Sequence, residues 1–436
     1  SVSEFPDYGD LWRWAMTLHL DEHLTAKELF SETNIIGHNH VLTIWLSSLA
    51  TDRLNYSLLW WLGFVGVVLS IGSLAFFVAR SVTGVLSAPL AMMVAVVTGL
   101  LSFRFDQRQV YFNSLLVFEQ LYYFIALAAL LLGARIQAKQ LLGSAVSTVG
   151  YAAIGLALLF GEAPSALSLI VLVGMAVLAL PFSGQWRHLG SLLTVALVGL
   201  AVKWGLRAFV GGRGDSNGPS SAVSFLDPRA VPDWLRLTGA SWRSFVDDRS
   251  QPAPDMLYLV LGLAIVALLV VAFVGTAYVL HRRVIEKGTL ELALAGIMLM
   301  SFAVLAAMFI VDARGLPGRY DVGRFVRSTQ FAIAGVALVG LAVWMHSVRL
   351  FVAWRCAVFA LAALVLLMRV PAANTVLDEA VFLRNNRVAE VAQLCAAEAD
   401  FEWDKIWFNA SPQRGAEFGE SELFARWQQD RCPPPA

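Results

Sequence analysis

The chain of 436 residues combines a hydrophobic fraction of 58% with 15% charged residues, and its mean hydropathy is +0.66. Soluble globular domains carry about 25% charged residues, so this balance excludes an ordinary soluble protein and predicts a multi-pass protein of the lipid bilayer. A formal net charge of +0 argues against a nucleic-acid partner, because no excess of lysine and arginine is available to neutralise phosphates.

The first 56 residues hold acids, histidines and aromatic residues together, ahead of the first long apolar window. Apolar residues between Leu11 and Leu20 recur at roughly helical spacing, which predicts an amphipathic helix on the membrane surface. The alternative is a segment that only caps a helical bundle. Because the chain begins with Ser1 rather than methionine, we expect its true N-terminus, and one further span, to precede this sequence.

Ten apolar windows follow, each long enough, at about 20 residues, to cross the hydrocarbon core of a bilayer. They lie near 57–80, 84–102, 113–134, 142–160, 164–183, 190–209, 257–281, 290–311, 328–346 and 353–371. The sequence therefore predicts an all-α fold, a polytopic transmembrane helical bundle. We expect an external loop at 1–56, a transmembrane domain at 57–371 with an external loop at 210–256, and a small external cap at 372–436.

The short loops between alternate spans are rich in cations. These cations are Arg80, Arg135, Lys139, Arg187, Arg282, Arg283, Lys287, Arg349 and Arg355. The positive-inside rule places such loops in the cytoplasm. All long polar segments then share the external side, where a one-sided active site would lie.

Two features of the external segments predict local structure. In the 210–256 loop, the stretches around Trp234 and Trp242 predict short helices that rest on the membrane. In the tail, Cys395 and Cys432 lie where a disulfide persists, so we expect them to pair. Cys356, the third cysteine, is expected to be a small buried hydrophobe in the last span.

Polar groups near the outer ends of spans are costly unless they face protein or water, which makes them candidate functional residues. They are Asp7 with Asp10, His38 with His40, Arg104 with Arg108, Glu119 with Gln120, and the cations from Arg314 to Arg327. A carboxylate base, histidines that bond an acceptor and arginines that hold a phosphate suit group transfer from a lipid phosphate. Each group also has a structural alternative: helix capping for the histidines, lipid contact for the arginines, and helix cross-linking for Glu119 and Gln120.

This plan resembles the GT-C superfamily of polytopic glycosyltransferases, and more narrowly its uncharacterised bacterial members. The likeness rests on the acidic first segment, on His38-Asn39-His40, on Phe103 through Leu116 leading into Glu119-Gln120, and on the Gly318-Arg319-Tyr320 loop. The segment departs from the family pattern, since an Asn-Glu-His-Arg-like motif is expected where the chain has His38-Asn39-His40 and Val41. That departure leaves a relative without catalysis as an alternative.

The resemblance implies transfer of a sugar from a polyprenyl-phosphate donor to a glycan, lipid or protein acceptor, on the external (periplasmic) face of a bacterial inner (plasma) membrane. It implies Asp10, or second Asp7, as the base. It also implies Arg104, Arg108 and Arg319 at the donor phosphate, and His38, His40, Glu119, Gln120 and Tyr320 as positioning residues. The carboxylates have a second role open to them, as ligands of Mg or Mn. The rival functions are a non-catalytic membrane subunit and a lipid-linked glycan transporter.

Overall fold

The computed structural model describes residues 57–83, 85–101, 119–143, 150–155, 163–183, 186–210, 228, 230–242, 255–282, 285–314, 329–346, 392, 395–396, 420 and 422–432. This part of the chain is helical and contains no β-strand, apart from one isolated bridge between Thr83 and Leu86. The all-α class predicted from the sequence is confirmed for these residues.

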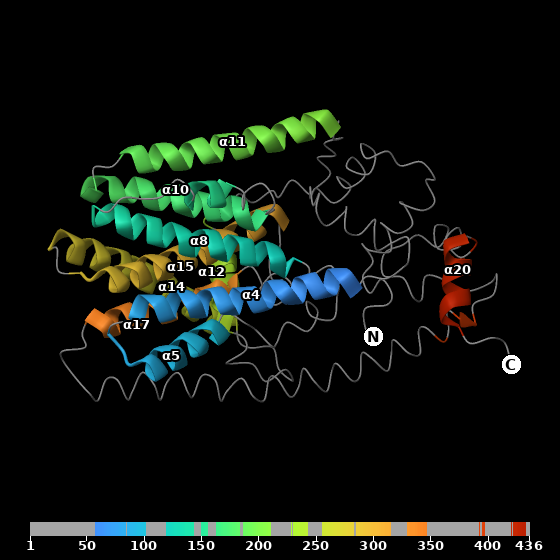
Figure 1. Cartoon of the computed structure of the whole chain (residues 1–436), viewed down its shortest axis with the longest axis horizontal. Helices are drawn as coiled ribbons and strands as arrows, with labels where there is room; N and C mark the ends of the chain where they lie inside the picture. Colours follow the sequence, from blue (N-terminus) through green and yellow to red (C-terminus); the bar gives the residue numbers. More distant parts are fainter. Residues whose placement is uncertain are drawn as a thin grey trace.

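Eight long helices form the body of the described structure. They are α4 (Ser57–Val82), α5 (Ala88–Leu101), α8 (Gln120–Leu141), α10 (Ala163–Ser183), α11 (Trp186–Val210), α14 (Asp255–His281), α15 (Lys287–Arg314) and α17 (Phe331–His346). Figure 1 shows these helices side by side in one bundle. Three shorter helices are α12 (Val231–Gly239), the 3₁₀ helix η2 (Ala240–Trp242) and α20 (Glu422–Arg431).

The bundle belongs in a membrane. Five of the described helices, α4, α8, α10, α14 and α15, are long and apolar enough to span one, and α5 and α17 are shorter apolar helices. The protein is therefore an integral membrane protein, as its composition predicts. The window at 353–371 lies outside the described residues, so the count of ten spans stays a prediction, and so does the division into three parts.

Two helices begin later than the apolar windows suggest. Five residues separate α4 from α5, which begins at Ala88 instead of near 84, and α8 runs from Gln120 to Leu141 instead of from 113 to 134. The shift brings Arg135 and Lys139 inside α8. The charged side chain of Arg135 is stabilised within this apolar helix because its guanidinium lies beside the carboxylate of Glu291 and over two phenylalanine rings.

The bundle has two ends, which we name after a residue at each. At the Arg135 end α4, α8, α10, α14 and α17 finish; at the opposite Gln120 end these helices begin (Figure 1). The described cations that lie at the Arg135 end are Arg80, Arg135, Lys139, Arg187, Arg282 and Lys287. Along α4, Trp61 and Arg80 are separated by roughly 28 Å at 1.5 Å per residue, close to the roughly 30 Å of a hydrocarbon core.

The centre of the bundle is α15, in which every residue from 291 to 300 is buried. It packs tightly on α17 because two glycines face each other. A Cβ added to Gly296 would lie 2.7 Å from the carbonyl oxygen of Gly335, and one added to Gly335 would lie 2.8 Å from that of Gly296. Small residues of this kind let membrane helices approach closely, where packing rather than a hydrophobic drive holds them together.

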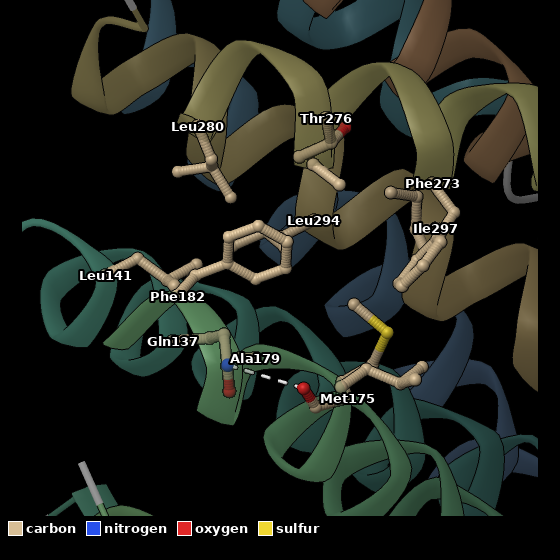
Figure 2. A pocket seen from close by; sticks show the side chains of 12 residues that line it. Gln137, Leu141, Met175, Ala179, Phe182, Phe273, Thr276, Leu280, Leu294 and Ile297 are labelled. Carbon is tan, nitrogen blue, oxygen red and sulfur yellow. Dashed lines mark hydrogen bonds between the residues drawn. The ribbon is translucent and has the colours of Figure 1, made fainter. Parts of the chain in front are cut away.

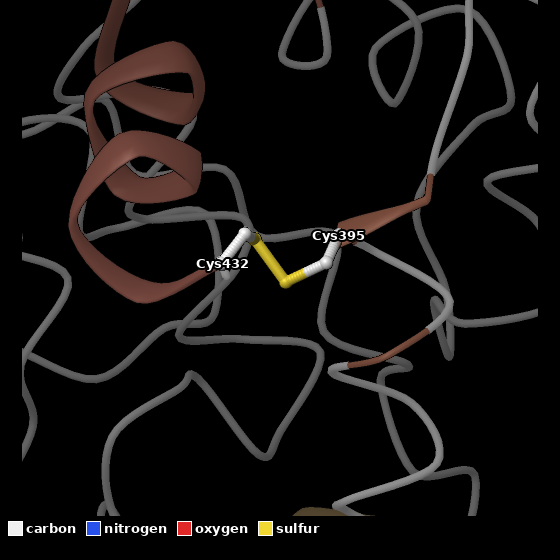
Figure 3. The surroundings of a disulfide bond; sticks show 2 residues. All are labelled: Cys395 and Cys432. Carbon is white, nitrogen blue, oxygen red and sulfur yellow. A yellow bond between two sulfur atoms is a disulfide. The ribbon is translucent and has the colours of Figure 1, made fainter. Parts of the chain in front are cut away.

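The tail contains the disulfide expected from its two cysteines. Cys395 is bonded to Cys432, which directly follows α20, and the two Cα atoms are 5.4 Å apart (Figure 3). The bond closes a loop with a sequence separation of 37 residues. A loop of this length corresponds to about 4 kcal/mol of stabilisation in the chain-entropy description. In Figure 1, α20 lies beyond the Gln120 end of the long helices.

The glycine contact predicts a specific loss of stability. We expect Gly296→Ala to destabilise the bundle by about 1–3 kcal/mol, because the new methyl group overlaps backbone that has nowhere to move. Gly340→Ala is the matched control, since a Cβ there meets nothing within 4 Å and the gain in helix propensity is the same. Melting curves in detergent measure both. Equal midpoints for the two variants would show that α15 and α17 do not touch as described.

Candidate functional site

The structure describes two of the predicted site residues, Glu119 and Gln120, which begin α8. The others lie outside the described residues. They are Asp7, Asp10, His38, His40, Arg104, Arg108, Arg319 and Tyr320. Gln120 lies at the Gln120 end of the bundle, where α8 begins.

Gln120 is bonded to a residue that the sequence did not single out. The side-chain Nε2 of Gln330 donates a hydrogen bond to Oε1 of Gln120 over 3.3 Å, and the two side chains are 4% and 3% exposed. The bond joins α8 to the turn that precedes α17. Nε2 of Gln120 has no hydrogen-bond partner among the described residues. A buried donor without an acceptor costs about 1–3 kcal/mol, so an acceptor oxygen placed beside this atom would be favoured.

The segment from Ala230 to Trp242 lies inside the bundle. The sequence had predicted that this segment would form short helices on the membrane surface. Leu237 and Ala240 pack against Tyr258 of α14 and against α15. Trp242 then packs against a cluster that contains Ile265 of α14, Met300 of α15 and Ala332 of α17. The expected surface position is thus corrected: α12 and η2 fill the space between three long helices.

Two glycines make this insertion possible. A Cβ on Gly239 of α12 would overlap the carbonyl oxygen of Tyr258, and a Cβ on Gly262 of α14 would overlap that of Leu235. The backbones of α12 and α14 are therefore in direct contact. Short helices at membrane depth are tolerated when protein covers them, and here six consecutive residues from 237 to 242 are buried or half-buried.

A second polar contact connects α12 with the glutamine pair. The hydroxyl of Thr329 donates a hydrogen bond to the carbonyl oxygen of Leu237 over 3.3 Å, which satisfies a group at the C-terminal end of α12. Thr329 precedes Gln330 in the chain, so α8, α12 and α17 meet at this point. The available signal in the sequence was the polar pair Thr329-Gln330 at the start of the apolar window 328–346, a pattern that resembles Glu119-Gln120 at the start of α8.

The described part of this end supplies mostly neutral hydrogen-bond donors. The hydroxyl of Ser241, which is 0% exposed, and the indole nitrogen of Trp234 are buried and have no partner among the described residues. The guanidinium of Arg236 pairs with Asp233 on the same helix over 3.2 Å. In the described ranges no group of three His, Cys, Asp or Glu side chains could hold a metal.

The Arg135 end also contains buried polar groups, and several of these are paired with one another. The carboxylate of Glu291 is 3.7 Å from Nε of Arg135 and 4.0 Å from Nζ of Lys287, and it accepts a hydrogen bond from Ser81 over 3.4 Å. The Arg135 guanidinium lies 5.1 Å from the centre of the Phe77 ring. These contacts join α4, α8 and α15, so we assign the cluster a structural role.

A chain of hydrogen bonds links α8, the segment 150–155, α10 and α11 at the Arg135 end. Nε2 of His188 contacts the amide oxygen of Gln137 at 2.8 Å, and because that oxygen only accepts, Nε2 carries the proton. Nδ1 then accepts the hydroxyl proton of Tyr151. The amide nitrogen of Gln137 donates to the carbonyl oxygen of Met175 over 3.4 Å. Both ring nitrogens of this neutral histidine are used, which makes it a satisfied structural residue.

Comparison with known proteins finds no family model, no curated protein and no solved structure that matches this chain.

The contact between Gly262 and the backbone of α12 predicts that a larger side chain at position 262 displaces α12 from its buried position. Thr238 is 0% exposed, so a Thr238→Cys variant in a Cys356→Ser background should react slowly with a maleimide. Adding Gly262→Val should speed the reaction roughly tenfold or more, because overlap with the Leu235 backbone costs about 1–3 kcal/mol.

Gly275→Val is the matched control on the same helix, since a Cβ at Gly275 meets nothing within 4 Å. We expect it to leave the labelling rate of Thr238→Cys unchanged. Fast labelling without any glycine substitution would mean that α12 is not buried between α14 and α15.

Proposed function

We propose that this protein is a membrane glycosyltransferase of GT-C type that moves a sugar from a polyprenyl-phosphate donor to an acceptor at the Gln120 end of the bundle. The acceptor is a glycan, a lipid or a protein. The proposal places the Gln120 end on the external face of a bacterial plasma membrane.

The observation that carries the proposal is the buried amide pair of Gln120 and Gln330. The chain segment with Arg104 and Arg108 leads directly into α8 at Gln120, and the segment with Arg319 and Tyr320 leads into α17 just after Gln330. Two arginine-bearing segments, far apart in sequence, thus precede two residues that are joined by one hydrogen bond. This supports a phosphate-binding role for the arginines and a positioning role for Gln120.

Two observations support the external orientation of the Gln120 end. Six described cations lie at the Arg135 end, against the two described acids Glu286 and Glu291, as the positive-inside rule expects of a cytoplasmic face. The disulfide joins Cys395 to Cys432, which directly follows α20, the helix beyond the Gln120 end. Such bonds persist in oxidising compartments.

The reaction can be written with these residues in named roles. The carboxylate of Asp10 takes the proton of an acceptor hydroxyl while the hydroxyl oxygen forms a bond to the anomeric carbon of the sugar. The bond from that carbon to the phosphate oxygen breaks, and the phosphate leaves with the electron pair. Arg104, Arg108 and Arg319 stabilise the charge that develops on it. His38, His40 and Tyr320 position the acceptor or the sugar, and Asp7 is the second choice of base.

The test is replacement of the base by an isosteric amide. Decaprenyl-phosphate sugars are offered one at a time together with cell-envelope glycan, and the release of decaprenyl phosphate is measured. We expect Asp10→Asn to lower the rate of this release by roughly 10²–10⁴-fold. Binding of decaprenyl phosphate should be retained. Asp52→Asn, an acid of the same N-terminal segment with no proposed role, is the matched control and should keep full activity.

Loss of activity in Asp7→Asn alone would move the base to Asp7. Wild-type turnover in both variants, each with an unchanged melting curve, would contradict the enzymatic proposal and favour a non-catalytic subunit or a transporter. Removal of Mg and Mn with a chelator separates the two roles of the carboxylates, since a general base needs no metal.

A further inference from the structure

We propose that a pocket at the Arg135 end holds an acyl chain of an anionic phospholipid from the surrounding leaflet. The pocket lies between α8, α10, α14 and α15, and it is separate from the site proposed for catalysis. The inference does not depend on the transferase activity.

The pocket is built by four helices that are each long and apolar enough to span a membrane. Figure 2 shows Phe182 and Met175 of one wall facing Leu280 and Phe273 of α14, with Ile297 of α15 beside them. The lining reaches the ends of three of these helices, because Leu141, Phe182 and Leu280 are each within the last two residues of α8, α10 or α14.

The chemistry of the wall selects an alkyl chain over water. The lining is apolar apart from Gln137 and Thr276, and both polar groups of the Gln137 side chain are already used by His188 and by the carbonyl oxygen of Met175. A buried water molecule needs two to four polar partners, which this wall does not offer. The medium around the spans is lipid hydrocarbon, so an acyl chain is the occupant that restores dispersion contacts to the lining atoms.

The charge at these helix ends selects the headgroup. Leu141, the last residue of α8, and Leu280, near the end of α14, belong to the lining. Arg282 follows α14, is exposed, and stacks on Tyr278 with its guanidinium carbon 5.5 Å from the ring centre. The described cations at this end outnumber the acids Glu286 and Glu291, and Glu291 is already paired. A negatively charged headgroup is the complementary partner.

Photolabelling with phosphatidylglycerol that carries a diazirine in one acyl chain tests the proposal, with the full-length protein in phosphatidylcholine vesicles. We expect label on residues 175–182 and 273–280 well above label on the exposed residues of α4, such as Trp61 and Phe76. Ala179→Trp fills the pocket and should lower that label roughly tenfold, because at least two methylene groups lose their place.

Val274→Trp is the matched control, because Val274 is exposed on α14 and does not line the pocket. Leu178→Trp, at a half-exposed lining position, replaces Ala179→Trp if that variant does not fold. Arg282→Gln should lower labelling by the phosphatidylglycerol probe about fivefold and leave labelling by the matching phosphatidylcholine probe unchanged.

Two results would overturn the proposal. Label spread evenly over α4 and the pocket, or label insensitive to both tryptophan substitutions, would mean that lipid only solvates the surface. Equal labelling by the two headgroups in the wild-type protein would contradict the choice of an anionic lipid.

Discussion

The direct contact between the backbones of α12 and α14 at Gly239 and Gly262 is the constraint on which the Gln120 end depends. It brings the carbonyl oxygen of Leu237 to the hydroxyl of Thr329. Thr329 also positions the neighbouring residue Gln330, whose side chain donates a hydrogen bond to Gln120. Backbone groups at membrane depth must be satisfied within the protein, so a short helix is stable there only when its neighbours approach this closely. Two residues without side chains therefore set the position of the polar groups at this end.

Both ends of the bundle contain buried polar atoms without a hydrogen-bond partner among the described residues. At the Arg135 end the side chains of Glu291, Gln137 and His188 have partners that join helices, whereas Nη2 of Arg135 has none among these residues. At the Gln120 end the amide nitrogen of Gln120 and the hydroxyl of Ser241 have none among the described residues. Such a donor costs about 1–3 kcal/mol, whereas an average hydrogen bond between membrane helices contributes about 0.6 kcal/mol. An unpaired donor at either end therefore costs more than one such hydrogen bond returns.

The sequence predicted the membrane class and most long helices, because a span must be apolar over about 20 residues and that pattern is local. It placed α8 too early because Arg135 looked like a loop residue, while its partner Glu291 lies 156 positions away. The burial of α12 was missed for the same reason: Asp233 and Arg236 suggest a surface helix, and the decisive contact joins Gly239 to a distant helix. Gln120 was found from its place at a span end. Its partner Gln330 was not, since the pairing is a tertiary contact.

The most direct test of the account is to ask which end of the bundle binds a polyprenyl phosphate. A photoreactive benzoylphenylalanine at position 119, at the start of α8, and another at position 83, exposed at the Arg135 end, would be irradiated with labelled decaprenyl phosphate. We expect a cross-link at position 119 that excess decaprenyl phosphate abolishes and decaprenol does not, and none of this kind at position 83. Competable cross-linking at position 83, or its absence at position 119, would contradict a lipid-phosphate site at the Gln120 end.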